Sequence, residues 1–317
     1  MLTVRFLVAA SLCAVLLATQ AGKPRWDPQQ SGVTDDLQAV SFVSDKTGWA
    51  AGDHNVVIKT SDGGATWKLL TERQALNKFT SVDFVDESDG WVQSMSVLLH
   101  TTDGGESWQP ANQLPGGGFG GACMLAKVRY QLKVHGTGNR VYRTSDGGNT
   151  WQELPSPLPR NDYTAIFFAD PQHGWVSGDN GRFARTEDGG RTWKPVEGLQ
   201  GNLTRMQFLT LTPEHGWLLP WYGKGGPMVT NDGGATWTNQ NAGIASFDPM
   251  EDLHFLSHND GVLLTDKAVY RTSNGGKNWK TIGKLSGFHA LSFPAADEGW
   301  VVGKKGAISH YHLVLEK

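Results

Sequence analysis

Six aspartate-centred turns are the first feature of the sequence that could do chemistry. Each copy follows the pattern Thr-x-Asp-Gly-Gly-x-Thr/Ser-Trp, and the sixth replaces both the acid and the last hydroxyl by Asn. Carboxylates beside hydroxyls could serve acid–base catalysis. However, an Asp in a tight turn also accepts backbone N–H bonds, and six copies spread along a chain cannot share one substrate. We therefore interpret these positions as structural: Asp62, Asp103, Asp146, Asp188, Asp232 and Asn274.

Three aspartates outside these turns raise the question of glycoside hydrolysis, which needs two placed carboxyl groups. Asp53, Asp179 and Asp266 stand in comparable turns of different repeats, so turn chemistry explains them as well. A sialidase would also need an arginine triad and a tyrosine nucleophile, but Tyr142 and Tyr270 occupy matching Tyr-Arg-Thr positions that mark them as structural. We expect no enzyme activity. The alternative class is a carbohydrate-active enzyme, sialidase- or glucanase-like, or a glycan-binding module.

Four histidines are the candidates for metal binding. His310 and His312 are two residues apart on an expected strand and face the same side, but no third ligand is evident. His173 and His215 each precede a Gly-Trp pair, where other repeats carry an acid, so this is a polar turn position. We expect no metal and no cofactor.

The aspartate turns recur at a fixed period, and this period identifies the elements that hold them. Their last Trp follows the previous one by 41, 43, 42, 44 and 42 residues, and Trp26 lies one period before Trp67. Gly-Trp pairs mark the same period at Gly48-Trp49, Gly90-Trp91, Gly174-Trp175, Gly216-Trp217 and Gly299-Trp300, with Gly261-Val262 in another slot. In the third repeat we expect a diverged equivalent near Lys133-Val134. Both markers predict seven repeats.

Each repeat reads as four short strands joined by turns. Asp-Gly between strands favours a hairpin because glycine accepts the positive φ that the turn needs. Seven repeats of this kind predict an all-β fold, a seven-bladed β-propeller of four-stranded blades. The last repeat has no aspartate turn and so lacks a fourth strand. We predict that residues 23–31 close the ring as the outer strand of that blade, beside residues 307–314, with Trp26 substantially buried.

The N-terminus has the layout of a secretory signal peptide. Arg5 precedes an apolar run that ends in small residues at Ala21, which predicts a signal peptide over residues 1–21 and a propeller over residues 22–317. Lipidation at Cys13 is not favoured, because Leu12 is too large for a processing site. Cleavage would leave Cys123 alone, so no internal disulfide is expected.

Composition and charge limit the partners. The net charge of −3, from 28 Lys and Arg against 31 Asp and Glu, argues against nucleic-acid binding. After the N-terminal run, no stretch approaches the roughly 20 apolar residues of a membrane span. We expect an exported monomer, periplasmic or extracellular.

The aspartate turn is an Asp-box, also called a BNR repeat, and its combination with Gly-Trp resembles one family. The segments Phe84–Trp108 and Phe168–Gly178 look like the photosystem II stability/assembly factors, and the likeness extends from Trp26 to the C-terminus. It implies a non-catalytic seven-bladed propeller that binds a protein client, for example a subunit of a membrane complex. In a photosynthetic host it would also imply the thylakoid lumen.

Two groups of residues are candidates for client binding. The first, the basic series, is the residue before each Asp-box Thr: Lys59, His100, Arg143, Arg185, Val229 and Arg271. The resemblance associates an arginine-rich surface with client binding. The second, the loop patch, joins aromatic and basic residues of two repeats, with Phe119 expected on the same face: Trp221, Tyr222, Lys224, Lys304 and Lys305. We expect the client to meet the loop patch, with the basic series adding electrostatic attraction.

Overall fold

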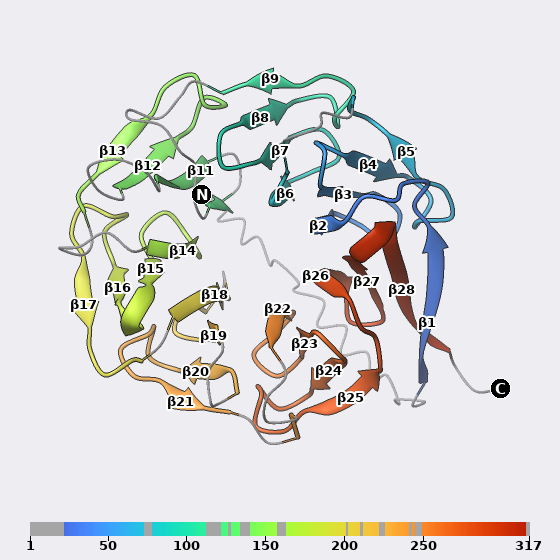
Figure 1. Ribbon diagram of the computed structural model, residues 1–317. Helices are drawn as coiled ribbons and strands as arrows, with labels where there is room; N and C mark the ends of the chain where they lie inside the picture. Colours follow the sequence, from blue (N-terminus) through green and yellow to red (C-terminus); the bar gives the residue numbers. More distant parts are fainter. Residues whose placement is uncertain are drawn as a thin grey trace, which may run out of the picture.

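The computed structural model describes residues 22–72, 78–111, 122–125, 128–133, 140–156, 163–200, 202–209, 212–221, 226–240, 243–244 and 249–314. Its strands form seven four-stranded antiparallel sheets arranged around one axis (Figure 1). We call these sheets blades and number them in chain order from the sheet that contains β2. The predicted signal peptide over residues 1–21 lies outside the described residues. No helix in the described part of the chain is long and apolar enough to cross a membrane.

The first three blades contain β2 to β13. Blade 1 has β2 (Leu37–Phe42), β3 (Gly48–Gly52), β4 (Val57–Thr60) and β5 (Lys68–Leu69). Blade 2 has β6 (Ser81–Phe84), β7 (Gly90–Gln93), β8 (Leu98–Thr101) and β9 (Gln109–Pro110). Blade 3 has β10 (Ala122–Leu125), β11 (Val128–Lys133), β12 (Arg140–Thr144) and β13 (Gln152–Leu154).

The next three blades repeat the same order. Blade 4 has β14 (Tyr163–Phe168), β15 (Gly174–Gly178), η1 (Asp179–Gly181), β16 (Phe183–Thr186) and β17 (Lys194–Val196). Blade 5 has β18 (Asn202–Phe208), β19 (Gly216–Trp221), β20 (Met228–Thr230) and β21 (Thr238–Asn239). Blade 6 has β22 (Met250–Phe255), β23 (Gly261–Thr265), β24 (Val269–Thr272) and β25 (Lys280–Gly283).

Blade 7 combines the two ends of the described chain. It contains β26 (Phe288–Ala295), β27 (Glu298–Gly303), η2 (Lys304–Gly306) and β28 (Ala307–Val314), with β1 (Lys23–Gln30) as its outer strand. β1 pairs with β28 over eight residue pairs, with Trp26 opposite Tyr311 (Figure 1). The Trp26 indole N–H donates to the Ile282 carbonyl at 3.0 Å. Trp26 is half-buried rather than fully buried, because it lies on an outer strand.

A Phe-Gly-Trp contact recurs between blades and explains the Gly-Trp pairs. Phe84 of blade 2 stacks on Trp49 of blade 1 with centroids 3.6 Å apart, and a Cβ on Gly90 would lie 2.3 Å from the Phe84 ring. Glycine is therefore needed where the ring crosses the second strand. The Trp49 indole N–H also donates to the Gly104 carbonyl of the next Asp-box at 3.0 Å. Each such Trp thus ties one blade to the next.

The third repeat departs from this pattern in a different place from the one expected. Arg129 pairs with Thr144 as Gly174 pairs with Thr186, so Arg129-Tyr130 occupies the Gly-Trp slot and the assignment near Lys133 was wrong. Arg129 is fully buried, with its guanidinium 5.1 Å from the Trp91 ring centroid. An arginine stands there because its planar cation covers the indole that a Phe ring covers elsewhere.

Strand direction separates two faces of the ring. In each blade the third strand starts at the turn that follows the second strand and ends at the Asp-box turn. We call the side with the second-to-third-strand turns the loop face and the opposite side the Asp-box face. Both η1 and η2 lie on the loop face.

Candidate functional site

Each Asp-box carboxylate is fully occupied by its own turn. In the second box Thr101 Oγ1 donates to Asp103 Oδ1 at 2.7 Å, Ser107 N–H donates to the same oxygen at 2.9 Å, and Ser107 Oγ donates to Oδ2 at 2.6 Å. These bonds from the Ser107 hydroxyl, the Ser107 N–H and the Thr101 hydroxyl lower the pKa of Asp103 to about 2. A carboxylate held ionised by three local donors is a poor acid or base, so the geometry suits a structural role.

The Asn of the sixth box makes part of the same network. Thr272 Oγ1 donates to Asn274 Oδ1 at 3.0 Å, and Asn278 N–H donates to the same oxygen at 2.9 Å. The amide therefore keeps the turn without a negative charge.

Each position of the basic series lies on the third strand opposite the second residue of the Gly-Trp slot, which is Trp except in blade 3 (Tyr130) and blade 6 (Val262). Lys59 lies opposite Trp49, with its ammonium 5.0 Å from the ring centroid and 3.3 Å from the Gly104 carbonyl that it donates to. Arg271 makes a two-pronged ion pair with Asp260, at 2.9 and 2.7 Å, and donates to the Ala296 carbonyl. Lys59 and Arg271 are thus engaged within the ring.

An acid before the Gly slot pairs with the basic-series position of the same blade in blades 2 and 6. His100 pairs with Asp89 at 3.0 Å, and Arg271 pairs with Asp260. In blade 4 this acid is replaced by His173, which pairs with Asp170 at 2.7 Å. Arg185 therefore lacks this partner.

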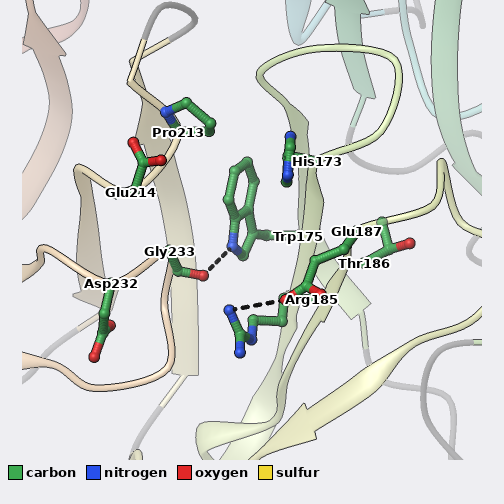
Figure 2. A pocket seen from close by; sticks show the side chains of 9 residues that line it. All are labelled: His173, Trp175, Arg185, Thr186, Glu187, Pro213, Glu214, Asp232 and Gly233. Carbon is green, nitrogen blue, oxygen red and sulfur yellow. Dashed lines mark hydrogen bonds and ion pairs between the residues drawn. The ribbon is translucent and has the colours of Figure 1, made fainter.

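Arg185 lines a pocket of about 190 Å³ between blades 4 and 5 on the Asp-box face (Figure 2). Its Nη1 lies 3.3 Å from Glu187 Oε1, but Glu187 also pairs with Lys194 at 2.7 Å. The Trp175 indole forms part of the wall and donates to the Gly233 carbonyl at 2.8 Å. Sequence reasoning named Arg185 but missed the pocket, although the replacement of an acid by His173 could have indicated it.

The described part of the loop patch and the basic series lie on opposite faces of the ring, so any electrostatic attraction from the basic series would act from the other side. Lys304 and Lys305 are exposed in η2 on the loop face, and Lys305 adopts φ 56° with its N–H donating to Asp36 Oδ1 at 2.8 Å. Trp221 ends β19 on the same face, two blades away. Arg143 and Arg185 lie one residue before the end of their third strands, on the Asp-box face. Tyr222, Lys224 and Phe119 lie outside the described residues.

Among the described residues, no group of three or more His, Cys, Asp or Glu side chains could hold a metal ion. His310 pairs with Glu298, and His312 Nε2 lies 3.6 Å from Asp27 Oδ2. Tyr142 and Tyr270 are buried, as their repeat positions suggested.

The fold and these turns define a class, the β-propellers whose blades carry Asp-boxes. Within that class, residues 18–158 and 156–286 match the family described as photosynthesis system II assembly factor YCF48. The chain belongs to this family, which confirms the resemblance noted in the sequence.

Relatives of known name agree with this membership. The chain is 25% identical to the chloroplastic photosystem II stability/assembly factor HCF136 of Arabidopsis thaliana over 310 residues, covering 87% of this chain and 75% of that protein. It is 24% identical to the photosystem II assembly protein Ycf48 of Synechococcus sp. (strain JA-2-3B'a(2-13)), covering 97% and 96%. A match to the assembly lipoprotein Ycf48 of Synechococcus sp. (strain CC9902) is 29% identical and spans about a third of each chain, 36% and 35%.

Solved structures share the fold. The chain superposes on YCF48 bound to D1 peptide with a TM-score of 0.72 at 23% identity, covering 93% of this chain and 98% of the other. YCF48 from Cyanidioschyzon merolae gives 0.70 at 19% identity, covering 90% and 98%. The GH74 enzyme of Niastella koreensis gives 0.66 at 12% identity, covering 88% and 43%. At these identities the likeness concerns the fold alone.

Proposed function

We propose that this protein is an exported, non-catalytic scaffold that binds a protein client, a membrane-complex subunit being the kind of client its relatives suggest. The observation that carries the proposal is the family match over residues 18–286. Two further findings support it. One is a related fold solved with a bound D1 peptide, and the other is the use of the Asp-box carboxylates as turn ligands.

Client docking is assigned first to the Asp-box face around Arg185. Arg185 lines a pocket, and its partner Glu187 also pairs with Lys194. Arg185 can therefore leave Glu187 for a carboxylate of the client while Glu187 keeps an ion pair. Arg143 occupies the equivalent position one blade earlier and is partly buried. Lys59 and Arg271 contribute to the positive potential of this face while each donates a hydrogen bond to a carbonyl of the next blade. The alternative docking surface is the loop patch, which comprises Trp221, Tyr222, Lys224, Lys304 and Lys305.

Affinity capture from the exported and membrane fractions of the host tests both surfaces. Arg143→Gln with Arg185→Gln should reduce client capture about tenfold, because hydrogen bonds to charged groups contribute about 1.5–3 kcal/mol. Lys304→Gln with Lys305→Gln tests the loop face. Lys280→Gln with Lys284→Gln removes two charges from the outer region of blade 6 and is the matched control. If the double arginine variant captures the client as well as the unaltered protein does and the double lysine variant does not, the docking surface is the loop face. Undiminished capture by both pairs would contradict both surfaces.

The same proposal includes residues 1–21 as a signal peptide, with the mature protein in the periplasm or outside the cell, or in the thylakoid lumen of a photosynthetic host. The intact mass of the exported protein tests this, since cleavage after Ala21 predicts an N-terminal Gly22. Size-exclusion chromatography with light scattering tests the proposed monomer.

The absence of hydrolase activity is a further part of the proposal. Asp53 binds Gln38 at 3.2 Å and Lys78 at 3.3 Å, which gives it a structural use. Turnover of a xyloglucan or of a sialoside, lost in Asp53→Asn or Asp179→Asn, would contradict the non-catalytic role.

A further inference from the structure

A β-bulge recurs near the start of the innermost strand in five blades. The register shifts at one residue in β2, β14, β18, β22 and β26, close to the loop-face end of each strand. The extra residue is polar in every case: Gln38, Thr164, Thr204, Glu251 and His289. Bulges redirect one side chain out of the alternating pattern and are common next to binding sites. Because the innermost strands surround the axis (Figure 1), these five backbone positions lie around it near its loop-face end, and we call them the polar ring.

Within this polar ring, bulge residues lie near the second-to-third-strand turn of their own blade. Gln38 Nε2 donates to Asp53 Oδ1 at 3.2 Å in blade 1. In blade 6 the turn residue is Asp266, whose N–H donates to the Pro249 carbonyl just before β22 at 3.1 Å. The Asp266 carbonyl in turn accepts the Gly287 N–H of blade 7 at 3.4 Å. Asp266 is thus held beside the start of two innermost strands.

Blade 6 holds two carboxylates without protein partners. Among the described residues, Glu251 is half-buried and forms no hydrogen bond or ion pair, and Asp266 Oδ1 is buried without a hydrogen-bond donor. Burial and the nearby charge of Asp266 raise the pKa of Glu251, while Arg205 and Lys304 oppose this. The carboxylates of Glu251 and Asp266 therefore place negative charge where solvent is partly excluded. A cationic group of a ligand would stabilise that charge.

The neighbouring carboxylate, Asp252, already has partners. Asp252 accepts the Leu291 N–H at 3.0 Å and the Leu253 N–H at 2.9 Å, and Arg205 lies 3.8 Å from it. Lys304 is exposed and forms no ion pair within the described part of the chain, so it can move away from an arriving cation. Burial and Lys304 lower the pKa of His289, which keeps its imidazole neutral and able both to donate and to accept a hydrogen bond.

We propose that Glu251 and Asp266 form a binding site for an arginine side chain of an extended peptide, at the loop-face end of the axis. The planar guanidinium suits two carboxylates, since it presents several N–H donors in one plane. Gln38 and His289 of the polar ring supply amide and imidazole groups for the backbone on either side of that arginine. This site is separate from the Arg185 pocket and does not depend on which surface holds the protein client.

Titration of the mature protein with a blocked peptide of glycines around one arginine tests the proposal, with the citrulline peptide as a neutral isostere and agmatine as a free guanidinium compound. We expect the arginine peptide to bind about tenfold more tightly than the citrulline peptide. Glu251→Gln and Asp266→Asn should each remove most of this difference. Glu197→Gln, an exposed residue of blade 4, removes the same charge elsewhere and should change nothing.

The variant Lys304→Met tests whether removing a positive charge strengthens or weakens binding of the arginine peptide. Removing this ammonium should tighten binding of the arginine peptide, because it takes away a competing positive charge. Equal binding of the arginine and citrulline peptides, or weaker binding in Lys304→Met, would overturn the cation site. Agmatine that binds as tightly as the peptide would overturn the assignment to a peptide. Thermal unfolding of each variant identifies any variant that fails to fold. The comparison of the arginine and citrulline peptides uses the unaltered protein, so it tests the proposal even if a variant does not fold.

Discussion

At the level of single residues, Asn274 performs in the sixth box what Asp103 performs in the second, with one side-chain oxygen instead of two. Both Oδ1 atoms accept the Thr hydroxyl and a backbone N–H. Only Asp103 also accepts a hydroxyl at Oδ2, from Ser107. The charge of the carboxylate therefore adds stability to a turn that an amide can already form.

Asp103→Asn is expected to fold and to lose the pH dependence of this turn. The pKa of Asp103 is about 2 in the folded protein, below the value of about 3.9 in an unfolded chain. The carboxylate therefore stabilises the fold above pH of about 4, and this contribution is lost as the pH falls through about 2. Urea unfolding should show a free-energy difference between the two proteins at neutral pH that shrinks on acidification. Asn274→Asp is the reverse control. A difference that does not change with pH would contradict this account.

At the level of strands, the spacing of Asp-boxes and Gly-Trp pairs predicted where most strands begin and end, because each marker is fixed by a local contact. The Gly is fixed by a Phe ring and the Trp by a carbonyl of the next blade. In blade 3 this slot holds Arg129-Tyr130, which retains neither the Gly nor the Trp. A search by residue type therefore placed the slot a few residues too late in the sequence. The two faces could have been separated from strand direction alone.

The bulges could not be predicted in the same way. One extra residue such as Glu251 in a short strand looks like a slip in the alternation of polar and apolar residues. Which residue leaves the pattern is decided by pairing with the second strand, which is a tertiary contact. This is why the carboxylates named from the sequence, such as Asp53 and Asp266, are those at turns, while Glu251 and His289 were found only in the structure.

Gly216→Ala tests the Phe-Gly-Trp contact between blades. A Cβ at Gly216 would lie 2.4 Å from the Phe208 ring, which stacks on Trp175 with centroids 3.5 Å apart. Since neither ring can move freely, we expect a loss of about 1–3 kcal/mol in the free energy of unfolding. Phe208→Leu removes the ring, so the double variant should lose less than the sum of the two single variants. Strict additivity in urea unfolding would show that the ring does not require the glycine.

At the level of the whole molecule, the outer strand of blade 7 comes from the opposite end of the described chain. β1 covers β28 over eight residue pairs, and Trp26 contacts Phe293 and Tyr311, with ring centroids 6.4 and 5.1 Å away. Pro24 and Pro28 cannot donate hydrogen bonds, so β1 is also a poor template for a further strand. β1 therefore contributes both buried area and a protected edge.

A chain that begins at Gly32 should lose both contributions. Its β28 would present an unpaired edge, and the pocket for the Trp26 indole would be empty, so we expect a lower Tm and concentration-dependent association. Loss of the Trp26 contacts alone should reduce the free energy of unfolding by at least about 2 kcal/mol, towards the lower end for a large aromatic because the side chain is half-buried. The chain that begins at Gly22 is the control, and a synthetic peptide of residues 22–31 added to the shortened chain should raise its Tm. If the shortened chain melts at the control temperature and stays monomeric in light scattering, β1 does not hold the ring together.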